Sequence, residues 1–241
     1  MKKIQELQGK KIALVGLGKS WFDFALARSN GEQFDEIWVM FAVANVVKHD
    51  RVFMMDPASR FLDSDDAGMQ TNGMKEVLLN HEGPIYTCEL DDRCPGLVEY
   101  PIEQVVAENN SYYLNNTVAY AIAFAYWHKV GSLHLFGIDF GYKGNLYFAE
   151  AGRACCEYWL ALCMKEGIEV GDMLLYFGAR YEATEFLYGD EIYAYEKDGI
   201  LTDLKCAFTR DQEEKIFAQH RIAEDKQLMY DYMVKNDGSF Y

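Results

Sequence analysis

The chain has 241 residues, of which 50% are hydrophobic and 15% aromatic, and its formal net charge at pH 7 is −15. This length and apolar content are sufficient to bury a full core. The negative charge repels nucleic-acid phosphates, so we expect no strong nucleic-acid binding and expect a small-molecule ligand instead. The longest apolar run, residues 117–127, is too short to cross a bilayer, and Glu6, Lys10 and Lys11 interrupt any secretory apolar region. We therefore expect a cytoplasmic protein that binds no membrane.

The six cysteines show no paired spacing of the kind that zinc sites have. A chain of this length needs no disulfides to hold its core, so reduced thiols and no metal centre are expected. The cysteines are Cys88, Cys94, Cys155, Cys156, Cys163 and Cys206.

Short apolar runs alternate along the chain with segments of helical periodicity, which is typical of a parallel sheet covered by helices on both faces. The predicted strands are 11–16, 36–42, 51–55, 84–88, 132–138 and 168–170. The predicted helices lie near 20–30, 70–81, 102–109, 116–129, 149–166 and 211–235. The fold class that follows is α/β and Rossmann-like, with a mostly parallel sheet, helices on both faces and a C-terminal helical appendage.

No composition break or internal repeat divides the chain, which predicts a single Rossmann-like nucleotide-binding domain over residues 1–241. Its core is expected at 10–171 and a C-terminal helix at 208–241. The segment between them, 172–207, is interpreted as a hairpin or a lid. Its tyrosine-rich part, 174–195, is suited either to closing over an acceptor or to packing in a homo-oligomer.

The first chemical signal is a glycine-containing turn between the first predicted strand and helix. Gly16, Gly18 and Ser20 occupy this junction, where free backbone N–H groups and a helix N-terminus can meet a phosphate. The dinucleotide fingerprint is incomplete, because Trp21 stands at its third glycine position. A nucleotide contact is predicted here, and a structural turn with Ser20 as the helix cap is the alternative.

The second signal is a run of three polar residues, Asn115, Asn116 and Thr117, that opens an alanine-rich helix. One polar residue is enough to cap a helix. Three in succession predict that a ligand base, sugar or phosphate shares this helix N-terminus, with capping alone as the alternative.

The third signal is the segment that follows the strand "SLHLFGI", which we expect near the centre of the sheet. Ligands of open α/β sheets bind beyond the carboxyl ends of the strands, and residues 139–147 lie there. Asp139, Tyr142, Lys143 and Tyr147 can hydrogen-bond a ligand, and the intervening glycines permit its close approach. We predict that this loop holds a nucleotide or its leaving phosphate.

These motifs together resemble a known group of proteins over about residues 10–190. The glycine turn, the block "EIWVMFAVANVVKHDRVFMMD", the polar helix cap and "GIDF" followed by tyrosines are similar to those of bacterial metal-independent sialyltransferases. They are equally similar to the motility accessory factor and 6-hydroxymethylpterin diphosphokinase group, including uncharacterised bacteriophage members of glycosyltransferase type.

The resemblance implies that the glycine turn and the polar cap bind the nucleotide of the donor, and that Tyr147 and Tyr142 hold its phosphate. It also implies a catalytic role for Arg153, beside Glu157, in the helix that follows. Two features depart from the pattern. Phe41 stands where an asparagine is usual, and the downstream general-base histidine has no counterpart.

Three further groups of acidic residues and histidines are candidates for catalysis or metal binding. Asp56 ends a predicted strand, where a carboxylate can accept a proton from a sugar hydroxyl or bind Mg²⁺, and we expect it to be the catalytic base. The "DSDD" run at 63–66 contains a metal-binding pattern but is interpreted as a solvated loop. The histidines, His49, His81, His128, His134 and His220, have no metal-ligand spacing.

The sequence thus leads to a hypothesis of a nucleotide-sugar-dependent glycosyltransferase that needs neither metal nor bound cofactor and takes an unknown acceptor. Two alternatives remain open at this point. One is a Mg²⁺-dependent pyrophosphokinase-type transferase, and the other is a non-catalytic nucleotide-binding or assembly protein.

Overall fold

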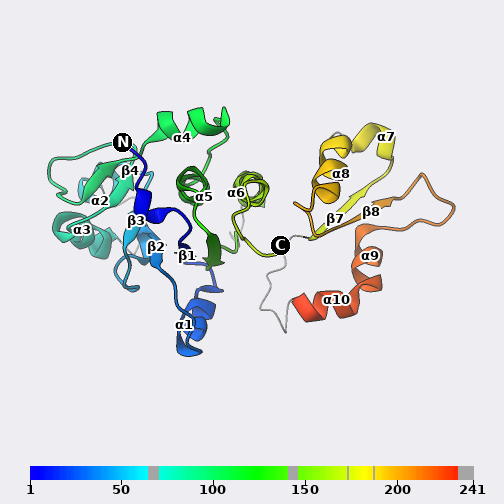
Figure 1. The fold of residues 1–241 in the computed structure, drawn as a ribbon, viewed down its shortest axis with the longest axis horizontal. Helices are drawn as coiled ribbons and strands as arrows, with labels where there is room; N and C mark the ends of the chain where they lie inside the picture. Colours follow the sequence, from blue (N-terminus) through cyan, green and yellow to red (C-terminus); the bar gives the residue numbers. More distant parts are fainter. Residues whose placement is uncertain (65–70, 141–145, 173, 187, 233–241) are drawn as a thin grey trace. The chain divides into compact units, whose positions relative to one another are not determined.

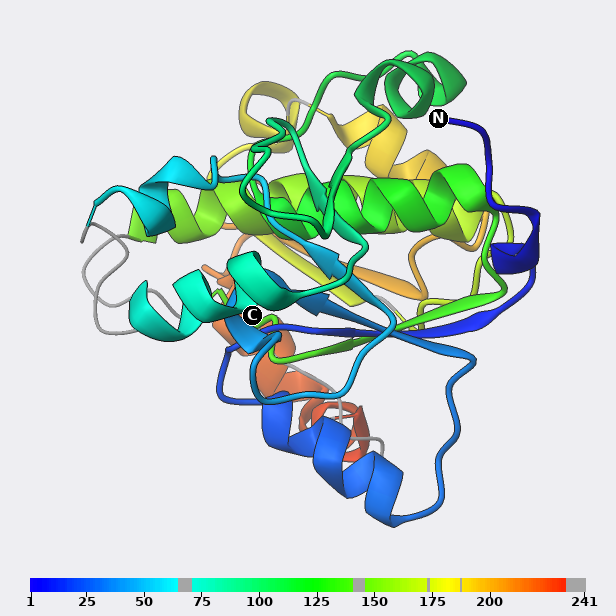
Figure 2. The ribbon, with the colours of Figure 1, turned by 90° about the vertical axis from the view of Figure 1, so that its left-hand side faces the viewer.

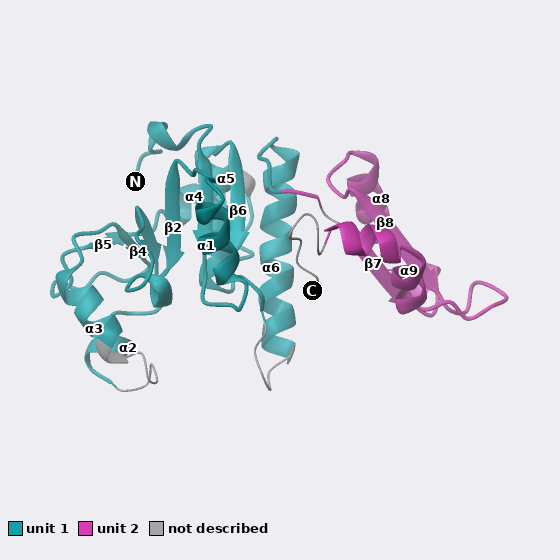
Figure 3. Cartoon of the chain, turned by 90° about the horizontal axis from the view of Figure 1, so that it is seen from below, with its two compact units in different colours: residues 1–170 teal, residues 171–241 magenta. Residues whose placement is uncertain are grey.

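The computed structural model describes residues 1–64, 71–140, 146–172, 174–186 and 188–232. It divides into two compact units, residues 1–170 and residues 171–241 (Figure 3). The expectation of one nucleotide-binding domain over residues 1–241, with a core at 10–171, stays a prediction.

The first unit is built on a six-stranded sheet in which every adjacent pair of strands is parallel. The strand order is β5-β4-β3-β2-β1-β6. The strands are β1 (Lys11–Val15), β2 (Glu36–Met40), β3 (Arg51–Phe53), β4 (Ile85–Thr87), β5 (Leu97–Glu99) and β6 (Ser132–Phe136). This confirms the predicted Rossmann-like α/β class.

Apart from the short helix Ser59–Leu62, which no predicted helix covers, the helices of the first unit lie close to the predicted segments. They are α1 (Trp21–Ser29), α2 (Ser59–Leu62), α3 (Thr71–Asn80), α4 (Ile102–Asn109), α5 (Thr117–His128) and α6 (Leu146–Lys165), with 3-10 turns η1 (Gln5–Leu7) and η2 (Phe41–Val43). The start of α5 is explained by its cap, since Asn116 Oδ1 accepts a hydrogen bond from the backbone N–H of Ala119 at 3.1 Å.

Alternate residues of the strands enter two different cores, as the pleat requires. Leu14, Trp38 and Phe53 pack in the core that α4, α5 and α6 cover. Val15 and Val39 pack in the core on the opposite face, with residues of α1, α2 and α3. Figures 1 and 2 show this layering, with α5 and α6 on one side of the sheet and α1 on the other.

Three predictions about the sheet were wrong. Strand β5 was missed, because its three residues are only partly buried and form no long apolar run. Residues 168–170 form no strand and contribute a single bridge, Glu169 to Ser132. The strand that precedes Asp139, β6, lies at the end of the sheet order and not near its centre, so β1 and not β6 has strand neighbours on both sides.

The second unit contains a two-stranded parallel sheet, β7 (Leu174–Ala179) and β8 (Asp203–Phe208). Its helices are α7 (Glu182–Glu185), α8 (Gly189–Lys197), α9 (Ala218–Glu224) and α10 (Lys226–Tyr230). The hairpin interpretation of 172–207 was therefore wrong, since a hairpin requires antiparallel strands.

The single C-terminal helix predicted over 211–235 is also wrong. Residues 211–217 are not helical, and α9 begins only at Ala218. The Asp211 carboxylate accepts a hydrogen bond from the backbone N–H of Glu182 at 2.7 Å, which fixes this segment against the start of α7. Among the described helices, none combines the length and the apolar character that spanning a bilayer would take.

Candidate functional site

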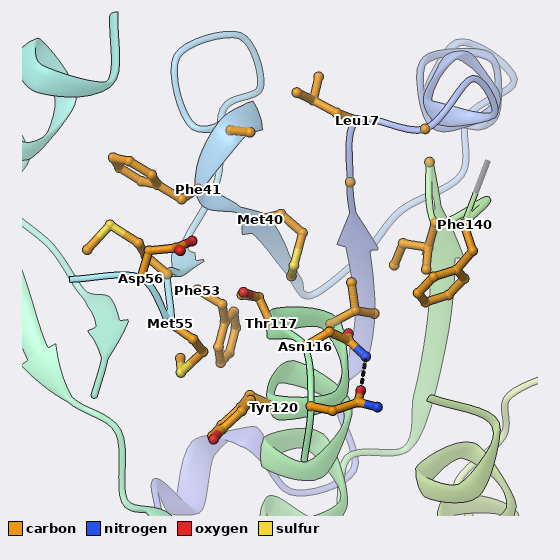
Figure 4. Close-up of a pocket in the computed structure, with 18 of the residues that line it drawn as sticks. Leu17, Met40, Phe41, Phe53, Met55, Asp56, Asn116, Thr117, Tyr120 and Phe140 are labelled. Atoms are coloured by element: carbon orange, nitrogen blue, oxygen red, sulfur yellow. Dashed lines mark hydrogen bonds between the residues drawn. The ribbon is translucent and has the colours of Figure 1, made fainter. Parts of the chain in front are cut away.

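A cavity of about 1200 Å³ lies at the carboxyl edge of the sheet in the first unit. The residues that follow β1, β2, β3 and β6 line it, together with the N-terminal part of α5 (Figure 4). Strands β2 to β5 follow one another on one side of β1, and β6 lies on the other side, so the strand order reverses between β1 and β6. Open α/β sheets bind ligands at such a reversal, and the cavity lies there.

The cavity brings together most of the residues that the sequence singled out. The predicted site residues in its lining are Gly16, Gly18, Asp56, Asn115, Asn116, Thr117 and Asp139. Ser20, Tyr147 and Arg153 are not among the described lining residues. Tyr142 and Lys143 lie outside the described residues.

The glycine turn after β1 is explained by contacts within the chain. A Cβ atom on Gly16 would stand 2.5 Å from the carbonyl oxygen of Gly137, and one on Gly18 would stand 2.5 Å from Oδ2 of Asp139. The two glycines therefore allow the segments after β1 and β6 to touch. Close approach of a phosphate is not needed to account for them.

The N-terminus of α1 is already occupied by a carboxylate. The backbone N–H of Ser20 donates to Asp139 Oδ2 at 3.0 Å, and the Ser20 hydroxyl donates to Asp139 Oδ1. The same Ser20 oxygen accepts a hydrogen bond from the N–H of Gly137 at 3.0 Å. A phosphate at this position would meet the negative charge of Asp139 instead of free donors.

The two asparagines before α5 are also engaged. Asn116 Nδ2 donates to Asn115 Oδ1 at 2.8 Å and to the carbonyl oxygen of Gly152 at 3.0 Å. Asn115 Nδ2 donates to the carbonyl oxygen of Ala151 at 2.9 Å. These side chains tie the start of α5 to α6, so the interpretation as structural caps accounts for both.

Asp56, the expected base, lies in the cavity wall and forms an ion pair with Arg60 at 2.5 Å. Of the acidic run at 63–66, Asp63 pairs with Arg93 at 2.6 Å, and Asp65 and Asp66 lie outside the described residues. Within the part of the chain that the structure describes, no three His, Cys, Asp or Glu side chains gather as a metal site would need.

Tyr147 and Arg153 both lie on α6. The Tyr147 side chain is 86% exposed. Arg153 forms ion pairs with Glu150 at 3.0 Å and with Glu157 at 3.4 Å, both on its own helix. Burial raises the pKa of Glu157. Arg153 thus pairs with carboxylates of its own helix, and it is not among the described residues that line the cavity.

Most of the cavity wall is apolar, which the sequence analysis did not anticipate. Met40, Phe53, Met55, Phe140 and Phe148 contribute to it. The available signal was the run of methionines and phenylalanines at the ends of two predicted strands, "WVMF" and "VFMMD". Met40, Phe53 and Met55 were predicted only as strand residues, and the alternation of a strand does not reveal which side chains stand at its open end.

Two histidines that are far apart in the sequence form a pair in the first unit. His49 Nε2 and His81 Nε2 are 2.9 Å apart, and the rings stack at 9°. His81 Nδ1 accepts from the N–H of Gly83, and His49 Nδ1 lies 2.6 Å from the carbonyl oxygen of Val47. His81 is therefore protonated at Nε2 and donates to His49, so this nitrogen has no lone pair for a metal.

The second unit offers a different arrangement at the carboxyl ends of its two strands. Arg180 directly follows β7, and Thr209 and Arg210 directly follow β8. The N–H of Thr209 donates to the carbonyl oxygen of Ala179, and that of Arg210 donates to the carbonyl oxygen of Arg180, each at 2.9 Å. The pairing of the strands thus brings two arginine backbones together at one sheet edge.

The packing beneath this edge explains its geometry. Phe177 and Phe208 lie on the paired strands, and Phe186, which contacts both, is buried. A Cβ atom on Gly178 would lie 3.1 Å from Cβ of Ala218, so the glycine admits the first residue of α9 close to β7. Arg180 is 72% exposed and pairs with Glu185 at 2.7 Å, while Arg210 is exposed.

No protein-family model matches the chain. It is 49% identical over 78 residues to pyruvate dehydrogenase [NADP(+)] of Euglena gracilis, covering 32% of this chain and 4% of that protein. It is 43% identical over 77 residues to the sulfite reductase [NADPH] flavoprotein component of Saccharomyces cerevisiae, covering 32% and 7%. It is 41% identical over 66 residues to NADPH–cytochrome P450 reductase of Oryctolagus cuniculus, covering 27% and 10%. The chain thus spans only 4 to 10% of the length of these relatives.

These similarities contradict the functional hypothesis drawn from the sequence. The relatives are enzymes, a dehydrogenase and reductases whose names carry NADP(+) or NADPH. They are not sialyltransferases, pterin diphosphokinases or bacteriophage proteins, so the resemblance to that group and the glycosyltransferase function inferred from it were wrong. The expectation that no cofactor is involved was wrong for the same reason.

Proposed function

We propose that this chain binds NADPH and contributes this binding to an oxidoreductase reaction, with the second unit supplying the contacts to the coenzyme. The observation that carries the proposal is the edge at which β7 and β8 end side by side in Arg180 and Arg210. Arginine is the side chain best suited to phosphate, because its planar guanidinium donates two parallel hydrogen bonds.

The residues at the end of β8 fit the phosphorylated coenzyme better than NADH. In dinucleotide-binding βαβ units, an acidic side chain after the second strand binds the ribose 2′-hydroxyl, whereas an arginine there accommodates the 2′-phosphate. Strands β7 and β8 are parallel, with α7 and α8 between them, which is the connectivity of such units, and β8 is followed by Thr209 and Arg210. No hydrogen bond or ion pair engages the guanidinium of Arg210 within the described residues.

Each residue then has a defined part in binding. Arg210 would pair with the 2′-phosphate, and the Thr209 hydroxyl would donate a hydrogen bond to it. Arg180 would add positive charge at the neighbouring strand end, where Glu185 orients it. When bound, NADPH supplies a hydride.

Isothermal titration of the full chain with NADPH and NADH tests this function. We expect Arg210→Ala to lower the affinity for NADPH about 10- to 100-fold, because a charge-assisted hydrogen bond is lost, and to leave the affinity for NADH nearly unchanged. Lys226→Ala is the matched control, since it removes one exposed cation from α10 of the same unit.

Two results would overturn the proposal. One is the absence of NADPH binding to the unaltered chain. The other is an equal loss of affinity for NADPH and NADH in Arg210→Ala, because such a residue would not recognise the 2′-phosphate.

A further inference from the structure

The cavity of the first unit has no part in the proposed function and needs its own explanation. It lies at the carboxyl edge of the sheet, at the reversal of strand order, and measures about 1200 Å³. Open α/β sheets bind small molecules at this position, and the volume exceeds what a drug-sized ligand requires. The chemistry of its walls defines the class of ligand.

The walls favour a flat aromatic ligand. Phe53 is fully buried in the cavity lining, and Met40 and Met55 lie near it (Figure 4). Thioether sulfurs and phenylalanine rings both make favourable contacts with an aromatic ring. Phe148, which is 51% exposed, belongs to the same lining, and a bound ring would remove part of its apolar surface from water.

The polar groups of the lining do not favour a charged ligand. The charged side chains among the described lining residues are two cations, Lys19 and Arg60, and two carboxylates, Asp56 and Asp139. Asp56 is paired with Arg60, and Asp139 accepts both hydrogen bonds from Ser20. The formal charges of the lining therefore cancel, Lys19 is exposed to solvent, and the helix terminus that would attract a phosphate is already capped.

The lining also holds the hydroxyl groups of Tyr120 and Thr117, and because that of Tyr120 is hydrogen-bonded to the Cys88 thiol, Thr117 is the group available to orient a neutral ligand. Thr117 lies in the lining beside Met40 and Phe53, and its hydroxyl can donate or accept a hydrogen bond (Figure 4). We infer that the cavity of the first unit binds an uncharged, planar heteroaromatic molecule, with its ring against the methionine and phenylalanine wall and a polar ring edge at Thr117.

Riboflavin and FMN are suitable probes, because they share one heteroaromatic ring system and differ by a phosphate. We expect riboflavin to bind saturably to the full chain, measured by the change in its fluorescence, and FMN to bind no more tightly than riboflavin. Absence of saturable riboflavin binding would overturn the inference. So would an affinity for FMN that exceeds that for riboflavin tenfold or more, since the site would then be a phosphate site.

Substitutions locate the binding site. Phe148→Ala removes an exposed ring of the lining and should weaken riboflavin binding about threefold to tenfold. Tyr112→Ala removes a ring that is 83% exposed and is not among the described lining residues, so it should leave the affinity unchanged. Ala42→Trp should block the cavity, and an unchanged melting temperature would show that this variant is folded.

Equal effects of Phe148→Ala and Tyr112→Ala would place riboflavin elsewhere and contradict the inference. Unaltered binding to a folded Ala42→Trp variant would contradict it as well. Arg210→Ala separates this site from the coenzyme site, because it should weaken NADPH binding and leave riboflavin binding unchanged. The NADPH measurement therefore tests the proposed function, and the riboflavin measurement tests the inference about the cavity, independently of each other.

Discussion

His128 shows how burial changes the chemistry of one residue. Its ring is 3% exposed at the end of α5, where Nδ1 donates to the carbonyl oxygen of Phe124 at 2.9 Å and Nε2 has no partner within the described structure. Burial lowers the pKa of His128 from 6.5 to about 4, and the positive charges of Arg51 and Lys3 oppose protonation further. The hydrogen bond to the Phe124 carbonyl oxygen and, less strongly, the charge of Glu36 raise the pKa but do not compensate.

This shift predicts a loss of stability on acidification. Between pH 6.5 and about 4 the unfolded chain binds a proton at His128 that the folded chain does not, so the free energy of unfolding falls as the pH falls. The loss from this group amounts to about 1.4 kcal/mol at pH 5.5. His128→Phe preserves the ring shape and removes the titration, so its stability relative to the unaltered chain should rise by this amount between pH 7.5 and 5.5.

Urea unfolding at pH 7.5 and 5.5 measures this difference. The exposed Phe22 provides the control, because Phe22→Ala changes no titratable group and should follow the pH dependence of the unaltered chain. A constant difference between His128→Phe and the unaltered chain across this range would show that His128 is protonated while folded.

At the scale of elements, the turn from β1 to α1 depends on β6. Backbone hydrogen bonds run from the N–H of Gly16 to the carbonyl oxygen of Phe136 at 2.8 Å and from the N–H of Gly18 to that of Gly137 at 2.7 Å. Asp139 then caps α1. The turn, the cap and the neighbouring strand end therefore form as one unit.

A glycine substitution tests this dependence. In Gly18→Ala the new Cβ would lie 2.5 Å from Asp139 Oδ2 and 2.7 Å from the carbonyl oxygen of Gly137, so we expect a loss of about 1–3 kcal/mol in the free energy of unfolding. Gly73→Ala is the control, since its Cβ would meet only the side-chain amide of Asn45 at 3.2 Å within α3. It should be neutral or stabilising by up to about 1 kcal/mol. Equal destabilisation by both would mean that the turn tolerates a side chain.

At the scale of the whole molecule, the two units give the proposed ligands separate targets. A ligand that binds only the folded form stabilises it by about 2.7 kcal/mol at 100 times its dissociation constant. We expect NADPH to raise the protection from hydrogen exchange in β7, β8 and α9 of the second unit. The strands of the first unit should respond to riboflavin instead.

Hydrogen exchange followed by mass spectrometry resolves the two responses. Equal protection of both units by NADPH would contradict the assignment of the coenzyme to residues 171–241. Protection confined to the first unit would contradict it too, because Arg180 and Arg210 would then have no contact with the coenzyme.

Local patterns were sufficient to predict the elements of the first unit and its fold class. Strands β1, β2, β3 and β6 and helix α5 follow from apolar periodicity and, for α5, from the Asn116 cap, which are properties of neighbouring residues. Periodicity failed where an element depends on distant partners. Strand β5 pairs with β4, and at the start of the non-helical stretch 211–217 the Asp211 carboxylate is bonded to the distant backbone N–H of Glu182.

The sequence by itself thus determined a parallel α/β sheet and the group of residues at its carboxyl edge, since strand order along a β-α-β chain forces those ends together. What those residues do was decided by the tertiary structure. Ser20 and Asp139 are 119 positions apart, and Asn115 and Ala151 are 36 apart, yet each pair is joined by a hydrogen bond. A polar side chain is available to a ligand only if folding leaves it without a hydrogen-bond partner. Partners that are far apart in the sequence are brought together by tertiary packing, which local spacing does not reveal.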